Sequence, residues 1–189
     1  MAKTIKTERQ QILDNLFPEG SRVTAEVKEA LVRMGFMTAP ASANHHGKYA
    51  GGLFDHSFNV AVCLERMTKS LSLKWGDPES PRIIGMLHDL CKCDQYVQLA
   101  PFTETYAYNT DMLLTGHAEK SLMLIGTLMP LTEEEMLCIR FHMGSFSEDQ
   151  QERNAYSRAV EKNENVLWTH TADMYASHIL ESEANSLNV

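Results

Sequence analysis

The chain has 189 residues, a length that suits one domain, and its 43% hydrophobic and 22% charged residues exclude a disordered or fibrous protein. Asp and Glu outnumber Lys and Arg by 25 to 17, and the formal charge of −8 argues against long nucleic acids as partners, because these need clustered cations. The longest nearly apolar run, residues 122–131, is too short to cross a bilayer. Four cysteines do not make a disulfide scaffold in a chain of this length, so we expect a cytoplasmic protein with reduced thiols and no membrane association.

The hydrophobic pattern is helical along nearly the whole chain. The first two helices are expected over residues 7–17 and 24–34, the second with Thr24 as its N-cap. The segment 36–52 follows no period and is rich in glycine. It is predicted to be a long loop, and a loop of this length in a compact domain favours a functional role.

Further helices are expected over residues 53–73, from Ser80 through the apolar run RIIGMLHDLCK, and over 116–128, 132–142 and 166–180. Residues 94–114 are mixed in character, and a loop or a short hairpin fits them equally well. Residues 143–162 are polar and are expected to hold at most a short helix. No segment alternates convincingly with a period of two, so the predicted fold class is all-α.

Several ionisable residues occupy positions that the apolar pattern would bury. His88 and Asp89 interrupt the most apolar helix, and Asp173 shares a helical face with apolar residues. Burial of even a neutral polar group costs about 2–7 kcal/mol unless the group is paired or bound to a metal. Three more histidines lie at or near expected helix ends, beside apolar positions: His56, His117 and His142. A cation coordinated by these imidazoles and carboxylates would remove every one of these costs.

The spacing of these candidates suits a helical bundle. Intervals of 25 to 32 positions separate successive groups, which places one or two ligands on each of five helices. These intervals are too long for a zinc finger. The pair Cys91 and Cys93 is a competing metal motif, but no second pair is present to complete a tetrahedral site.

The motifs GGLFDHS, GMLHDLCK and HTADMYAS, in this order, resemble the HD superfamily of metal-dependent phosphohydrolases. They contain His56, the pair His88 and Asp89, and Asp173. Two further segments, TGHAEKS and IRFHMGS, match the expanded form of the family, which holds two metals. The resemblance covers residues 36–180 and implies an HD-domain helical bundle with the metal site among facing helices.

The resemblance also implies the metal ligands. The first metal would be held by His56, His88, Asp89 and Asp173, and Asp89 would bridge to a second metal completed by His117 and His142. One or two divalent ions are expected, Fe or Mn first and Zn, Ni or Mg as alternatives, because imidazoles with carboxylates suit transition metals. Such ions lower the pKa of a shared water to about 7 and clamp phosphate oxygens, so no side-chain nucleophile is needed. Asp89 is therefore also a catalytic candidate, and Lys92, which follows it by three positions, is the second one.

Four residues are candidates for substrate contact: His46, Tyr49, Lys92 and Arg140. Lys92 follows the pair as HDLCK, and the resemblance favours a contact with substrate phosphate, whereas 5′-nucleotidase-like members carry HDxxE. A lysine stabilised by the dipole at a helix C-terminus explains Lys92 equally well. A surface charge is the simpler explanation of Arg140. His46 and Tyr49 belong to the glycine-rich loop. This loop could close over the substrate as a lid, or it could be an ordinary loop whose glycines form turns, and the sequence is equally compatible with both.

The expected organisation is an N-terminal helical extension at 1–35, an HD domain at 36–180 and a C-terminal tail at 181–189. The expected function is hydrolysis of a small phosphomonoester or phosphodiester, nucleotide-like in character. Two alternatives stay open. Inositol oxygenase and similar HD oxygenases use a similar six-ligand set, which makes a di-iron oxygenase possible. A non-catalytic HD module that senses a nucleotide is the other alternative.

Overall fold

The structure is a computed structural model that describes residues 7–44, 47–101, 103–145 and 149–181. The described part contains eight α-helices and one two-stranded sheet, so the chain is mostly helical. The helices are α1 Glu8–Leu16, α2 Ala25–Arg33, α3 Gly52–Leu71, α4 Ser80–Leu87, α5 His117–Gly126, α6 Glu133–Arg140, α7 Gln150–Lys162 and α8 Asn165–Tyr175. A 3₁₀-helix, Leu90–Cys93, follows α4, and a π-helix, Ala176–Leu180, follows α8.

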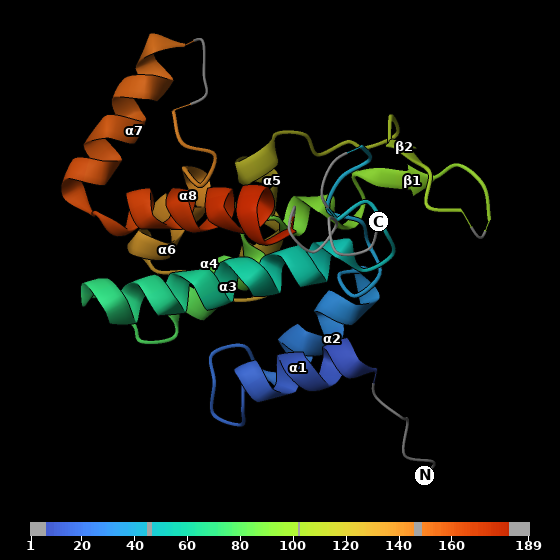
Figure 1. Ribbon diagram of the computed structural model, residues 1–189, viewed down its shortest axis with the longest axis horizontal. Helices are drawn as coiled ribbons and strands as arrows, with labels where there is room; N and C mark the ends of the chain where they lie inside the picture. Colours follow the sequence, from blue (N-terminus) through green and yellow to red (C-terminus); the bar gives the residue numbers. More distant parts are fainter. Residues whose placement is uncertain (1–6, 45–46, 102, 146–148, 182–189) are drawn as a thin grey trace.

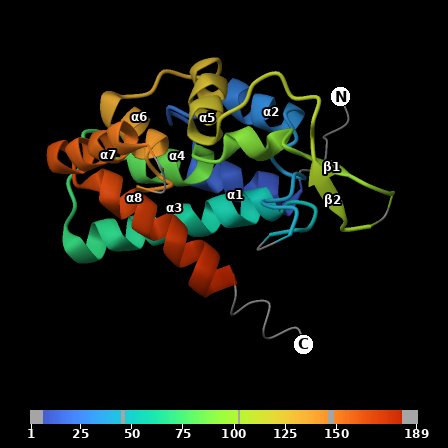
Figure 2. The ribbon, with the colours of Figure 1, turned by 90° about the horizontal axis from the view of Figure 1, so that it is seen from above.

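The long helix α3 lies at the centre of the arrangement. The helices α1 and α2 lie on one side of it and α8 on the other, while α7 and the hairpin occupy opposite ends of the molecule (Figure 1). Seen from above, α8 crosses α3 (Figure 2). None of the helices in the described ranges combines the length and the apolar character that a membrane span requires.

Helix α4 approaches α3 closely at Gly85. A Cβ atom at this position would lie 2.3 Å from the Cα of Ala61 and 2.5 Å from its amide nitrogen. A glycine therefore allows the two helix backbones to touch. The C-terminal end of α4, which carries His88, is thereby held close to α3, which carries His56.

Within the described residues, one hydrophobic cluster joins the N-terminal helices to α8. Its members include five fully buried side chains from different parts of the chain. They are Phe17 and Leu31 from the N-terminal segment, Leu64 from α3, Ile83 from α4 and Ala172 from α8. The segment expected as an N-terminal extension thus shares its core with the rest of the bundle. Its place outside or inside an HD domain stays a prediction.

A buried ion pair adds a polar connection between the same parts. The side chain of Glu135 in α6 is 0% exposed, and Arg22, before α2, donates to both of its carboxylate oxygens, at 2.7 Å and 2.9 Å. The hydroxyl of Ser80 and the amide of Thr132 donate to the same carboxylate, each at 2.8 Å. The buried charge is therefore paired and hydrogen-bonded, as a charge in the interior requires.

The helix expected from Ser80 through Lys92 ends earlier than the sequence predicts. It stops at Leu87, His88 is its C-cap, and Asp89 leaves helical geometry with φ −105° and ψ 21°. Consecutive side chains of a regular α-helix point about 100° apart. The break therefore changes the directions of the two side chains from those in a continuous helix, and His88 and Asp89 both face the same centre.

The polar segment 143–162 contains a longer helix than expected. α7 runs for 13 residues, and the carboxylate of Asp149 accepts a hydrogen bond from the amide of Gln151 at its start. The prediction of at most a short helix was wrong because the apolar stripe is weak. It consists of four residues that pack against the core, namely Ala155, Tyr156, Ala159 and Val160.

The segment 94–114 contains the short hairpin that was one of the two expectations for it. Strand β1, Tyr96–Gln98, pairs in antiparallel fashion with β2, Tyr106–Tyr108. Each strand has three residues, too few for an alternating pattern to be visible in the sequence. The chain is thus mostly helical and not purely so.

The close contact at Gly85 leads to a stability prediction. Gly85→Ala should lower the free energy of unfolding by about 2 kcal/mol or more, because the added methyl group meets backbone atoms that cannot move aside. Gly126→Ala is the matched control, since a Cβ at this helical glycine meets nothing within 4 Å, and it should be neutral or slightly stabilising. Urea unfolding measures both. Equal midpoints for Gly85→Ala and wild type would contradict the packing described.

Candidate metal centre

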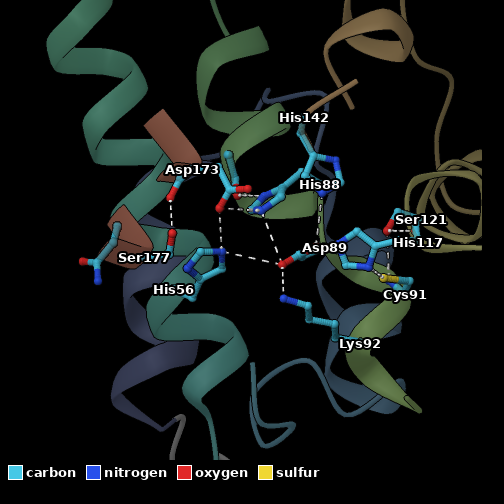
Figure 3. Close-up of polar contacts among 12 residues, drawn as sticks. His56, His88, Asp89, Cys91, Lys92, His117, Ser121, His142, Asp173 and Ser177 are labelled. Atoms are coloured by element: carbon cyan, nitrogen blue, oxygen red, sulfur yellow. Dashed lines mark hydrogen bonds and ion pairs between the residues drawn. The ribbon is translucent and has the colours of Figure 1, made fainter. Parts of the chain in front are cut away.

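The six candidate ligands converge at one place in the bundle (Figure 3). They come from α3, the end of α4, the start of α5, the residues after α6, and α8, and they are His56, His88, Asp89, His117, His142 and Asp173. α7 lies between two of these elements in the chain and contributes none of the six. Three of the imidazoles are at most 1% exposed and Asp89 is 2% exposed, so the centre is buried.

One side of the centre gathers four donor atoms. The Nε2 atom of His56 lies 3.2 Å from Oδ1 of Asp173 and 3.6 Å from Oδ2 of Asp89. The Nε2 atom of His88 lies 3.5 Å and 3.9 Å from Oδ2 of Asp89 and Oδ1 of Asp173, respectively. Two donors about 2.1 Å from one ion, separated by about 90–110°, lie about 3.0–3.4 Å apart. The shortest of the four distances lies in this range and the other three are longer, so the four atoms surround a space that can admit a divalent ion.

The other side of the centre is formed by the second oxygen of Asp89. Its Oδ1 atom lies 2.8 Å from Nε2 of His117 and 3.5 Å from Nε2 of His142. The two oxygens of one carboxylate thus face two separate pairs of imidazoles. His117 is the most accessible of the four rings, with 29% of its side chain exposed.

Each of the four imidazoles has a partner at Nδ1, the ring nitrogen that does not face Asp89. These partners are Glu181 Oε1 at 2.8 Å for His56, the carbonyl of Gly85 at 2.9 Å for His88, Cys91 Sγ at 3.3 Å for His117, and the carbonyl of Ile139 at 2.7 Å for His142. An oxygen acceptor at Nδ1 fixes the proton there and leaves the lone pair on Nε2. The three rings with an oxygen at Nδ1, those of His56, His88 and His142, are therefore oriented as metal ligands are.

Several donor atoms of the centre lack a hydrogen-bond partner within the described ranges. They are Nε2 of His88 and Nε2 of His142, and Oδ1 of Asp89 has at most the Nε2 atom of His117, 2.8 Å away; all three atoms are buried. A buried polar atom without a partner costs about 1–3 kcal/mol, and here lone pairs face a carboxylate. A cation between these atoms would satisfy all three, so the donor set fits a metal.

The protonation states of the side chains in the centre are consistent with metal binding. Burial lowers the pKa of His88 to about 4, which keeps this imidazole neutral. Burial raises the pKa of the Asp89 carboxyl group, but the Lys92 ammonium and the neighbouring imidazoles lower it to a net value well below the ordinary one. Burial also lowers the pKa of His56, but hydrogen bonds to Asp173 and Glu181 outweigh this and raise it to about 9. His56 is therefore protonated at neutral pH when no metal is bound.

Lys92 lies in the centre itself and not on a helix surface. Its Nζ atom is 2.6 Å from Oδ2 of Asp89, and only 12% of its side chain is exposed. Burial lowers the pKa of the ammonium group, but the Asp89 carboxylate raises it above the ordinary value, so the group stays charged. Lys92 thus places a fixed positive charge beside the carboxylate that both pairs of imidazoles share.

A cavity of about 310 Å³ opens onto the centre. Four of the six candidate ligands line it together with Lys92. Its other walls come from the loop before α3, from the hairpin and from the C-terminal half of the chain, and include Ser42, Gln95, Tyr96, Met143 and Met174. The centre is therefore reachable by a small molecule.

Tyr49, a candidate from the glycine-rich loop, forms its hydrogen bond away from the six candidate ligands. The Tyr49 hydroxyl donates to Oδ2 of Asp55 at 3.0 Å, and the Arg9 guanidinium of α1 binds both oxygens of the same carboxylate, at 2.9 Å and 2.8 Å. Tyr49 is not among the residues that line the cavity. His46 lies outside the described residues.

Arg140 lies beside the centre but faces another cavity, of about 170 Å³, which shares His117 and Met143 with the first. Its guanidinium is 3.0 Å from the carboxylate of Glu119 and 2.7 Å from that of Glu152. The structure therefore pairs Arg140 with two acidic side chains. Contact with a substrate stays a prediction for this residue.

Two residues at the centre were not predicted as site residues. Glu181 falls in the segment expected as a tail, although it follows Asp173 by eight positions and so can return to the same side of a helix. The sequence indicates Cys91 only as a member of the pair with Cys93. In the structure its thiol instead lies beside the ring of His117. Both contacts depend on how helices pack, which the chain does not display locally.

The chemistry that this arrangement supports is metal binding. Three overlapping groups of donors have their atoms within 4.8 Å of one another: His56, His88 and Asp173; His88, Asp89 and His142; and Asp89, Cys91 and His117. A buried His, Asp and Cys cluster of this kind could hold a metal ion. Comparisons with protein-family models, with curated proteins and with solved structures find no match for this chain.

The charge state of His56 predicts a pH dependence of metal binding. Because the pKa of this imidazole is about 9 without metal, an ion that binds its Nε2 atom at pH 7 must displace a proton. Mn²⁺ binding at pH 7 should release about one proton, and the affinity should rise about tenfold per pH unit until the pH passes about 9. Calorimetry in buffers of different ionisation enthalpy measures the release. An affinity that is constant from pH 7 to 9 would contradict a protonated His56.

Proposed function

We propose that this chain is a metal-dependent phosphohydrolase of the HD type, which cleaves a small phosphomonoester or phosphodiester, nucleotide-like in character. The observation that carries the proposal is the position of Asp89. One oxygen of this buried carboxylate faces His56 and His88, and the other faces His117 and His142. A carboxylate so placed is suited to bridge two divalent ions, for which Fe or Mn fit the donors best.

When bound, such ions supply a Lewis acid for phosphoryl oxygens and activate water for an in-line displacement. The chain itself orients the donors. His88 is fixed through the carbonyl of Gly85, and His142 is fixed through the carbonyl of Ile139. Because burial keeps these positions dry, electrostatic interactions with a charged substrate are less screened there than at the surface.

The charge balance of the centre favours an anionic substrate. Asp89, Asp173 and Glu181 contribute negative charges, and Lys92 contributes a positive one. One divalent ion neutralises this set, and a second would leave an excess of positive charge. A phosphate group that enters the cavity would compensate for that excess, and Lys92 is placed to contact it as a compact point charge.

The cavity limits the size of the substrate. Its volume of about 310 Å³ is at the lower end of small-ligand pockets, which span about 300–1,000 Å³. Tyr96, Met143 and Met174 offer apolar surface to an organic group, and Gln95 offers a polar side chain. A single phosphorylated small molecule fits this description better than a polymer.

Hydrolysis assays test the proposal directly. With Mn²⁺ or Fe²⁺, the purified protein should hydrolyse nitrophenyl phosphate, the corresponding diester or a nucleotide, and a chelator should abolish the activity. Asp89→Asn and His88→Ala should each lower kcat/KM by more than about 100-fold, which exceeds the loss expected for an outer partner of a ligand. Glu65→Gln, an exposed change on α3, is the control that should keep full activity.

Undiminished hydrolysis in Asp89→Asn and His88→Ala would overturn the proposal. Equal turnover under argon and in air would separate hydrolysis from a di-iron oxygenase, which consumes dioxygen. Metal-free protein that binds a nucleotide as tightly as metal-loaded protein, and turns over no ester, would favour a sensing module instead.

Lys92 provides a sharper test because its charge acts on metal and substrate in opposite directions. Lys92→Met removes a cation 2.6 Å from Asp89, so Mn²⁺ should bind about tenfold more tightly, while kcat/KM for the phosphate ester should fall by about tenfold or more. Lys162→Met makes the same change at an exposed lysine and should alter neither quantity. Metal affinity by titration and steady-state kinetics give both numbers. Weaker Mn²⁺ binding in Lys92→Met would contradict the role assigned to its charge.

A further inference from the structure

The surroundings of His56 differ from those of the other three imidazoles in the centre. His88 and His142 have a backbone carbonyl at Nδ1, and His117 has the Cys91 thiol. His56 instead has a carboxylate, because Oε1 of Glu181 lies 2.8 Å from its Nδ1 atom. Only 11% of the Glu181 side chain is exposed, so this charge is held close to the ring and away from solvent.

The end of the last helix brings Glu181 to this position. The regular helix α8 ends at Tyr175, and the π-helix Ala176–Leu180 follows it directly. A π-helix has wider turns than an α-helix, so it changes the direction in which the following side chains point. Two acidic residues eight positions apart thereby reach the same ring, Asp173 at Nε2 and Glu181 at Nδ1.

Helix α3 supports the same contact from the other side. Asn59, one turn after His56, has its Nδ2 atom 3.5 Å from Oε1 of Glu181. The crossing of α8 over α3 brings the two elements together (Figure 2). The contact therefore links the two helices that carry His56 and Asp173, across 125 positions of the chain.

From this geometry we infer that Glu181 is a positioning residue, which holds His56 through Nδ1 so that Nε2 is presented to a metal ion, and which adds a negative charge to the centre. The inference rests on the metal centre of the proposed function. A carboxylate at Nδ1 fixes the tautomer and orientation of a ligand ring and makes Nε2 a stronger donor. Glu181 thereby also offsets the positive charge that Lys92 brings to the centre.

The test measures metal affinity without any substrate. Mn²⁺ should bind to Glu181→Ala about 10- to 100-fold more weakly than to wild type, the usual loss when such a partner is removed. Glu181→Gln should fall between the two, because its amide oxygen accepts the same hydrogen bond without the charge. Glu65→Gln removes one exposed carboxylate from α3 and should keep the affinity of wild type.

A second measurement separates positioning from a general effect on folding. The visible absorption spectrum of Co²⁺-loaded protein reports the ligand field, and it should change in Glu181→Gln, an isosteric variant that keeps the helix end intact. Thermal unfolding of the metal-free variants monitors the fold itself. If Glu181→Ala does not fold, the Gln variant carries the test with both readouts.

The outcomes are distinct. Wild type and both Glu181 variants with Mn²⁺ affinities within twofold of one another would overturn the inference and leave the proposed function in place. Wild type that binds metal but cleaves no phosphate ester would overturn the proposed function, while a weakened Glu181→Ala would still support the inference. Wild type that binds no divalent metal would overturn both.

Discussion

The structure depends on the burial of one negative charge. The Asp89 carboxylate is 2% exposed at the centre of the bundle, and an ionised group in such a place needs cations around it. Lys92 supplies one, and the imidazole nitrogens from four other positions face its two oxygens. The break in α4, the close approach at Gly85 and the crossing of α8 over α3 all serve to bring these groups to the same carboxylate.

Part of this arrangement could be predicted from the chain, and the reason is local. His88 and Asp89 stand in an apolar run whose period marks them as buried, so the need for a compensating cation is visible in the sequence itself. The same holds for Asp173 on an apolar helical face. The mostly helical character follows from the same periodicity. α7 is the exception, because its apolar stripe of four small or half-buried residues is too weak to stand out in a polar segment.

The parts that could not be predicted depend on packing between distant segments. The end of α4 at Leu87 is one such part, since nothing in the run after Ser80 marks the end of a helix. Tyr49 turns toward Asp55 because Arg9, 46 positions away from that aspartate, fixes the carboxylate. Glu181 reaches His56 only through a wide helical turn. In each case the deciding partner lies far away in the sequence.

The ion pair between Arg22 and Glu135 has a consequence for how the chain can be shortened. Trimming the first two helices would leave a fully enclosed glutamate without its cation, and the loss of such a partner destabilises a protein by about 3–5 kcal/mol. Whole domains are stable by only about 5–15 kcal/mol. A fragment that begins at the glycine-rich loop would therefore lose a large share of its stability, and a fragment chosen for crystallisation should keep α1, Arg22 and α2.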